Sequence, residues 1–156
     1  MVAWLEAVIA WRMTAYFEDK TPENRPSMPG LKRGASDFAR ALLENRLDAD
    51  DCLVLMLALA ADLAPQSLDP FLIRNPGMDR GFSEFGGVQA GTGGFRPTVD
   101  TALFLLAGSD IAARLAAISR LSDDAPLVAL GMVSLQPGVL SEIRAQPLVI
   151  EPAFVS

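Results

Sequence analysis

The segment Phe85–Pro97 reads FGGVQAGTGGFRP, and glycine-rich segments of this kind often hold phosphate groups. Gly86–Gly91 satisfies G-x-x-x-x-G, but a phosphate loop then needs a lysine and a hydroxyl residue, where this chain has Thr92 and Gly93. No apolar strand leads into the segment. The dinucleotide pattern G-x-G-x-x-G also fails, because Arg96 stands where the third glycine should be. The sequence therefore predicts a long, flexible, exposed connection and not a nucleotide site.

Aromatic side chains are the other candidate contacts. Phe82, Phe85 and Phe95 lie in or beside the glycine-rich segment, and this mixture predicts a segment anchored by apolar rings, either on the domain itself or on a partner. Trp4 and Trp11 stand seven residues apart beside the apolar stripe of the first predicted helix. These five residues are the candidate interaction residues, and Trp4 and Trp11 fit a role in the core equally well.

The carboxylates do not form a recognisable acid–base site. General acid–base catalysis needs two carboxyl groups in different environments across a cleft, whereas Asp123 and Asp124 are adjacent at a predicted helix end. Asp48, Asp50 and Asp51 are spaced loosely like a calcium loop, but the glycine and the distal glutamate of that loop are missing. We expect these three aspartates to cap a helix and to favour its first turn.

Nucleophilic and metal chemistry also lacks its usual residues. The chain contains no histidine, and its single cysteine, Cys52, lies in an apolar helical stretch where a buried, inert thiol is expected. One cysteine cannot form an internal disulfide or a cysteine-based zinc cluster. The sequence therefore predicts no catalytic residue, metal site or cofactor site in this chain, which is not expected to be an enzyme.

Length and composition are those of one globular domain. The chain has 156 residues, of which 51% are hydrophobic and 21% charged, and this is ample material for a core. The net charge is −6, and Lys20 and Lys32 are the only lysines, so nothing supplies the basic face that nucleic-acid binding needs. The longest apolar run, Cys52–Ala61, is too short to span a membrane, and the N-terminus lacks signal-peptide features. We therefore expect a cytoplasmic protein with neither a nucleic-acid nor a membrane partner.

Five helices and a late hairpin are expected to position these residues. The two β-like runs of the hairpin are Leu127–Leu135 and Pro147–Glu151. The predicted helices are Val2–Phe17, Ser36 (as N-cap) to about Arg46, Ala49–Leu63, Thr98 to Gly108 and Asp110–Leu121 (with Ser109 as N-cap), with a short helical turn at Ser67–Arg74. The predicted inner faces are Phe38, Ala39, Leu42 and Leu43 in the second helix, and Ile111, Leu115 and Ile118 in the fifth.

This order predicts a mainly α fold with a small C-terminal β-hairpin, that is, a winged-helix-like helical domain. Residues 1–33 are expected to form an N-terminal helix with a proline-rich connection. Residues 34–156 are expected to form the winged-helix-like domain, with the glycine-rich loop at 75–97.

The fourth predicted helix occupies the position of a DNA-recognition helix in this order. A helix that reads bases presents Arg, Asn, Gln or Lys to them. This helix offers Thr98, Asp100 and Thr101 and is otherwise apolar. It is therefore expected to be buried nearly all round or to dock on protein, and DNA binding is rejected.

Two apolar motifs resemble a known family. GFRPTVDTALFLLAG (Gly94–Gly108), preceded by FSEFGG, and LVLMLALAADLAP (Leu53–Pro65) resemble the region before the ATPase core in AAA-plus ATPases encoded with phage-tail-like contractile injection systems. The tail PLVIEPAFVS is similar to the strand and helix start just before the ATPase linker. The resemblance covers about residues 36–156, and it implies a winged-helix-like domain in front of an ATPase module.

The chain carries no ATPase motif, so the resemblance transfers no catalytic residue. It implies a non-catalytic interaction or regulatory domain, with ATP and magnesium expected only in a downstream module. The implied partners are its own ATPase core or injection-system components, with oligomers forming through the ATPase module. The alternatives are a small acidic winged-helix transcriptional regulator, a stand-alone adaptor, and an enzyme or small-molecule binder that uses the glycine-rich loop.

Overall fold

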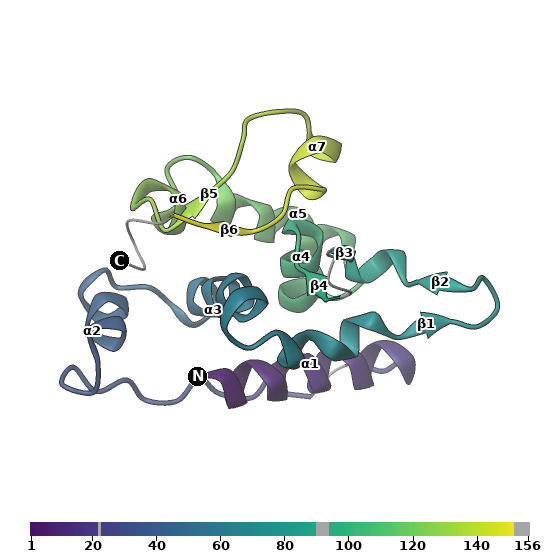
Figure 1. The fold of residues 1–156 in the computed structure, drawn as a ribbon, viewed down its shortest axis with the longest axis horizontal. Helices are drawn as coiled ribbons and strands as arrows, with labels where there is room; N and C mark the ends of the chain where they lie inside the picture. Colours follow the sequence, from purple (N-terminus) through teal and green to yellow (C-terminus); the bar gives the residue numbers. More distant parts are fainter. Residues whose placement is uncertain (22, 90–93, 152–156) are drawn as a thin grey trace.

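The structure is a computed structural model that describes residues 1–21, 23–89 and 94–151. It is mainly helical, with small antiparallel strand pairs (Figure 1). In Figure 1 the first helix lies along the bottom, two core helices lie above it, and the C-terminal elements cover the top. The three long helices that build the core are α1 (Val2–Phe17), α3 (Ala49–Leu63) and α4 (Val99–Ala107).

Helices α1 and α3 have the predicted bounds because their local signals are strong. Leu5, Val8 and Ile9 of α1 have no exposed surface, since they repeat on one helical face. The side chain of Asp48 accepts a hydrogen bond from the backbone N–H of Asp51 and so caps α3. Helix α3 is buried on almost every side as far as Ala60, and it therefore forms the centre of the domain.

Helix α2 (Asp37–Glu44) is shorter than predicted. Ser36 caps it as expected by accepting the N–H of Ala39, but Arg46 has a φ of 54°, which ends the helix before that residue. The predicted inner face is correct for Ala39 and Leu42, which are buried. It is wrong for Leu43, which is 36% exposed, because the next residue along a helix turns away from the face that Leu42 occupies.

The chain between α3 and α4 is more ordered than predicted. The 3₁₀ helix η1 (Pro65–Leu72) replaces the predicted turn at 67–74 and begins at the proline. The expectation of an exposed connection is correct for residues 76–81 and wrong for Phe85, Phe95 and Pro97, which are buried, and residues 90–93 lie outside the described residues. Between η1 and α4 the chain forms two short antiparallel strand pairs. The first pair is β1 (Arg74–Asn75) with β2 (Arg80–Gly81), and the second is β3 (Val88–Gln89) with β4 (Phe95–Arg96). The 3₁₀ turn η2 (Ser83–Phe85) lies between the two pairs.

The fifth predicted helix is divided into α5 (Ile111–Ala117) and the 3₁₀ turn η3 (Ile118–Leu121), and its N-cap is Asp110 instead of Ser109. The prediction that Ile111 and Leu115 face the core is wrong, because they are 76% and 56% exposed.

The C-terminal region contains the expected strand pair, but the pair is smaller than predicted. Pro126 begins a helical turn, α6 (Pro126–Ala129), because a proline fits the first position of a helix. The strand prediction is therefore wrong for the first half of 127–135. Strand β5 (Val133–Ser134) pairs antiparallel with β6 (Val149–Ile150), and α7 (Leu140–Arg144) lies in the connection between them.

A third backbone segment joins this pair. Thr98 forms a β-bridge with Pro147, the N–H of Leu148 donates to Pro97 (3.0 Å), and the N–H of Val99 donates to Gln146 (3.0 Å). The entrance to α4 is therefore tied to the beginning of β6.

The N-terminal helix shares its core with the rest of the domain. One hydrophobic cluster contains Leu5 and Ile9 of α1, Leu55 of α3, and Leu103 and Phe104 of α4. The division of the chain into residues 1–33 and 34–156 stays a prediction, and residues of both parts pack in this one cluster.

Gly87 offers a test of the glycine-rich packing. It has a φ of 79°, and a Cβ added there would overlap the Phe95 ring, which is stacked on Phe71. We expect Gly87→Ala to lower the free energy of unfolding by about 2–4 kcal/mol in urea denaturation. The control is Gly30→Ala, where the added Cβ meets nothing within 4 Å, and that change should be neutral or stabilise by up to about 1 kcal/mol. Equal effects at the two sites would contradict the packing described here.

Candidate functional site

The two predicted tryptophans lie at the start of the domain. Trp4 is 5% exposed, and its Nε1 donates to the carbonyl oxygen of Pro26 (3.0 Å). Trp11 is half-buried, and its Nε1 donates to the carbonyl oxygen of Glu23 (3.0 Å). Both indoles therefore fasten the proline-rich connection onto α1, and Trp4 has little surface left for a partner.

The three predicted phenylalanines pack onto the domain itself. Phe85 and Phe95 are 1% and 8% exposed. Phe95 stacks on Phe71 with ring centroids 5.0 Å apart, and Phe85 lies 4.8 Å from Phe104 of α4. Phe82 is half-buried and meets the ring of Tyr16 edge-on. The structure thus brings these phenylalanines together as one aromatic cluster with Phe71, Phe104 and Tyr16.

The glycines beside these rings permit close packing instead of phosphate binding. Gly86 has a φ of 59°, and a Cβ at this position would meet Asp100 and Thr98 of the α4 entrance. The N–H of Gly87 donates to Oγ1 of Thr98 (3.0 Å). A backbone N–H that could have bound a phosphate therefore already has a partner within the fold.

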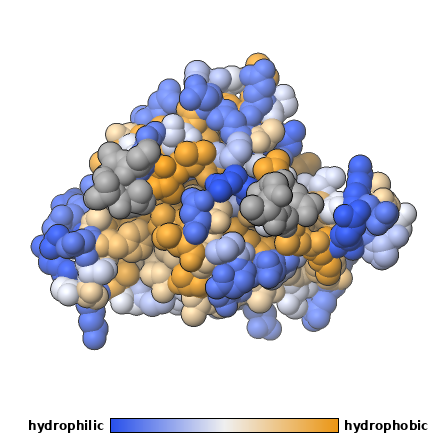
Figure 2. Space-filling model, in the orientation of Figure 1, coloured by the Kyte–Doolittle hydropathy of each residue, from blue (hydrophilic) through white to orange (hydrophobic). Residues whose placement is uncertain are grey.

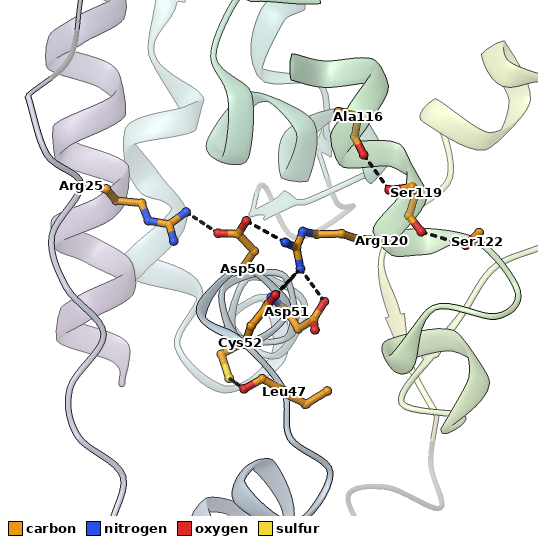
Figure 3. A network of polar contacts seen from close by, with 10 residues as sticks. Arg25, Leu47, Asp50, Asp51, Cys52, Ala116, Ser119, Arg120 and Ser122 are labelled. Carbon is orange, nitrogen blue, oxygen red and sulfur yellow. Dashed lines mark hydrogen bonds and ion pairs between the residues drawn. The ribbon is translucent and has the colours of Figure 1, made fainter. Parts of the chain in front are cut away.

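A cluster of charges at the start of α3 was missed by the sequence analysis (Figure 3). Arg120 of η3 reaches three carboxylates: its guanidinium nitrogens lie 2.8 Å from Asp48, 3.2 Å from Asp50 and 3.3 Å from Asp51. Asp50 also pairs with Arg25 at 2.7 Å. The capping aspartates were predicted, but no local signal could reveal a partner 72 residues away along the chain.

These carboxylates have unequal proton affinities. Burial raises the pKa of Asp48, but the hydrogen bond from the Asp51 N–H and the contact with Arg120 outweigh it, so the pKa is lowered. Burial is the largest cause of the raised pKa of Asp51, the Asp48 carboxylate adds to it, and Arg120 opposes both. Burial, with both neighbouring aspartates, also raises the pKa of the Cys52 thiol to about 11. That thiol is fully buried, in agreement with the prediction that it is buried.

This arrangement fits a structural clamp better than a catalytic centre. Asp51 is 4% exposed, so a substrate has little access to the group whose pKa is raised. Among the described residues, no group of three or more His, Cys, Asp or Glu side chains could hold a metal ion. Asp123 and Asp124 stay exposed at the predicted helix stop, where Oγ of Ser122 donates to Asp124 (2.7 Å).

The exposed side of α5 is the most distinctive surface. Its residues, called here the α5 outer face, are Ile111, Ala112, Leu115 and Ala116, and all four are exposed. No residue of α5 is buried. The inner side instead carries Arg114, which lies 3.0 Å from Glu84 and donates to the carbonyl oxygen of Gly108 (2.8 Å). These contacts hold the apolar side of the helix toward solvent.

A second apolar area is visible on another face. Figure 2 shows hydrophobic side chains at the surface over α3 and β6, with hydrophilic groups on either side. Among the exposed hydrophobic residues of these two elements are Leu63 at 76% and Val149 at 47%. This area is less regular than the α5 outer face, where the exposed residues follow one helical side.

Comparisons with protein-family models, with curated proteins and with solved structures found no match to this chain. In the described part of the chain, no single helix has both the length and the apolar character needed to cross a bilayer, and one bent pair, α3 with η1, meets those criteria only in combination. The assignment of a function therefore depends on the chain's own residues.

Removing Arg120 tests the clamp. Arg120→Gln should lower the free energy of unfolding by about 1–3 kcal/mol at pH 7, because Asp48 and Asp51 then repel each other without a counter-ion. Arg120 lowers the pKa of both carboxylates, so its removal raises them. The loss should therefore shrink as the pH falls through these raised values and the carboxylates become protonated. Urea denaturation of both proteins from pH 7 down to about pH 4 measures this.

The control for that measurement is Arg40→Gln. Arg40 pairs with Asp37 at 2.6 Å, but the two side chains are 51% and 91% exposed, so the loss should stay below about 0.5 kcal/mol. A loss from Arg120→Gln that is equally small, or that grows as the pH falls, would contradict the clamp.

Proposed function

We propose that this chain is a protein-interaction domain without catalysis of its own, and that the α5 outer face is its contact surface. The observation that carries the proposal is the orientation of α5, which exposes Ile111 and Leu115 while the charged Arg114 takes the inner position. Folding alone would favour the reverse, since burying a large aliphatic side chain contributes about 1.5–3 kcal/mol. An apolar surface kept in water at that cost is typical of a docking site.

The charges at the ends of this face indicate the chemistry of the partner. Asp110 precedes α5, and the exposed Asp123 and Asp124 follow η3. None of these three has an ion-pair partner among the described residues, and the whole chain carries a net charge of −6. The partner we propose is a protein helix with an apolar stripe flanked by lysine or arginine.

The backbone order supports a winged-helix-like reading of the same surface. Leaving out the short elements, the order along the chain is α3, α4, α5, β5 and β6. The segment Pro97–Thr98, just before α4, pairs with Pro147–Leu148 at the start of β6. In this reading β5 and β6 form the wing, and α5 takes the position of the recognition helix in place of the buried α4. A recognition position with apolar residues and acidic ends favours a protein target over DNA.

The resemblance of the α3 and α4 motifs suggests the parent protein. We place the domain in front of the ATPase core of a AAA-plus ATPase linked to a contractile injection system, acting in the cytoplasm. ATP and magnesium would then belong to the ATPase module. The partner would be that module or an injection-system component, and the domain would recruit or regulate it.

Charge substitution on the α5 outer face tests the contact surface. Ile111→Lys combined with Leu115→Lys should weaken binding to the purified ATPase core or injection-system component by about 100-fold in calorimetric titration. The melting temperature should hardly change, because both side chains are mostly exposed. Leu63→Lys, equally exposed at the end of α3, should bind like the wild type. Unchanged binding by the double variant would show that the α5 outer face is not the contact surface.

The gene itself tests the proposed parent. The reading frame beyond Ser156 should encode G-x-x-x-x-G-K-[ST] within roughly the next hundred residues. Absence of that motif, together with neighbouring genes unrelated to injection systems, would refute the proposal that the parent protein is such an ATPase. It would leave the proposal of the α5 outer face as the contact surface untouched. A salt-dependent gel shift with DNA would instead favour the transcriptional regulator.

A further inference from the structure

A cleft of about 250 Å³ lies beside the C-terminal ends of α1 and α4. Arg12 and Tyr16 of α1 line it together with Phe104 and Gly108, and Lys20 and Asp110 are among the exposed residues at its edge. Its volume is below the range of about 300–1,000 Å³ that is usual for pockets of drug-sized ligands. The cleft is therefore suited to a small group and not to a nucleotide.

Arg12 is the unusual group in this cleft. It is only 8% exposed, and it has no ion-pair partner among the residues that the structure describes. Its Nε donates to the carbonyl oxygen of Leu105 (3.2 Å), in the last turn of α4, and its guanidinium lies 4.4 Å from the centre of the Trp11 ring. Desolvation by burial lowers the pKa of Arg12, and the charged neighbour that adds to this effect is another cation, Arg25.

A buried guanidinium normally has a carboxylate partner, because desolvating an unpaired charge is costly. The C-terminal end of α4 offsets part of that cost through its dipole and the Leu105 carbonyl. The two Nη atoms of Arg12 make no hydrogen bond within the described chain. Their planar pair of donors matches the two oxygens of a carboxylate or phosphate group.

The backbone leaves room for such a group. A Cβ at Gly108 would lie 2.9 Å from Nη1 of Arg12, so the glycine lets the guanidinium pack directly against the backbone, and the room for a ligand is that of the cleft which both residues line. Lys20 adds a second cation at the edge, where its Nζ also pairs with Glu18 at 2.5 Å. The acidic residues at the edge oppose an anion only weakly, because Asp19 and Asp110 are exposed and the side chain of Asp110 already accepts the N–H of Ala113.

We infer that this cleft binds a small oxyanion group, a carboxylate or a phosphate, through the Nη donors of the buried Arg12, with Lys20 as a secondary cation. The group can come from a free small anion or from the C-terminus of a peptide. This site adjoins the α5 outer face at Asp110 but uses other residues, and it does not depend on the proposed function.

The test follows the ¹⁵N-labelled protein by NMR during titration with sodium phosphate or sodium acetate, with sodium chloride keeping the ionic strength constant. We expect saturable shifts of the Arg12 Nε–H and the Gly108 N–H, with a midpoint on the order of 1 mM. Arg12→Lys keeps the charge but loses the planar donors, so it should weaken binding at least about tenfold. Shifts that stay linear, or that match those in chloride alone, would overturn the inference.

Matched variants keep the test decisive if Arg12→Lys does not fold. Ala15 lines the cleft, so Ala15→Leu should abolish binding, whereas Ala10→Leu on the exposed side of α1 should leave it unchanged. Lys20→Gln should weaken binding about two- to fivefold and Lys32→Gln should not. If Ala15→Leu binds as well as Ala10→Leu, the site is elsewhere and the inference fails.

Binding measurements with short peptides distinguish the two sources of the oxyanion, a free small anion and the C-terminus of a peptide. A short peptide with a free C-terminus that binds at least about tenfold more tightly than acetate, while its amidated form does not bind, identifies a chain end as the ligand. Equal binding of acetate and the free-acid peptide identifies a free small anion. Both results support an oxyanion site, and binding of the amidated peptide as tightly as the free acid contradicts it.

Discussion

The burial of α4 is the constraint on which the rest of the structure depends. This helix is apolar on nearly all sides, so it needs cover from several directions at once. Helices α1 and α3 cover part of it, the η2 turn brings Phe85 against Phe104, and α5 and α7 close the remaining sides. The glycine-rich segment, the N-terminal helix and the C-terminal elements thus serve one requirement, and the same packing leaves the Arg12 cleft at the end of α4.

Charges then determine how the covering elements are oriented. Asp100, in the first turn of α4, lies 3.6 Å from Arg114 of α5 and 3.4 Å from Arg144 of α7. Arg114 also bonds the carbonyl of Gly108 at the other end of α4, so α5 cannot rotate without breaking several contacts. The exposed apolar side of α5 therefore results from where the carboxylates lie. Specific polar contacts here override the simple tendency of aliphatic residues to face inward.

The sequence predicts those parts of the fold that depend on neighbours along the chain. The bounds of α1 and α3, the Ser36 and Asp48 caps and the end of α4 at Gly108 all follow from local periodicity and capping. The parts it misses depend on distant partners: the orientation of α5 follows from Arg114, and the charge cluster needs Arg120. No pattern within a window of a few residues contains that information. The candidate aromatic residues pack within the domain, which is one of the two roles that the sequence left open, and their role as contacts for a partner stays a prediction. The cleft beside Arg12 follows only from the fold.

The ties between β6 and the α4 entrance have a mechanical consequence. The N–H of Leu148 bonds Pro97, Gln146 accepts the N–H of Val99, and the N–H of Glu151 bonds Met132. A pulling force applied at Glu151 is therefore carried by backbone hydrogen bonds to Met132 and to the entrance of α4, one of the buried core helices. The domain therefore transmits a load from Glu151 to its core, and separating β6 from the α4 entrance requires these backbone hydrogen bonds to break together.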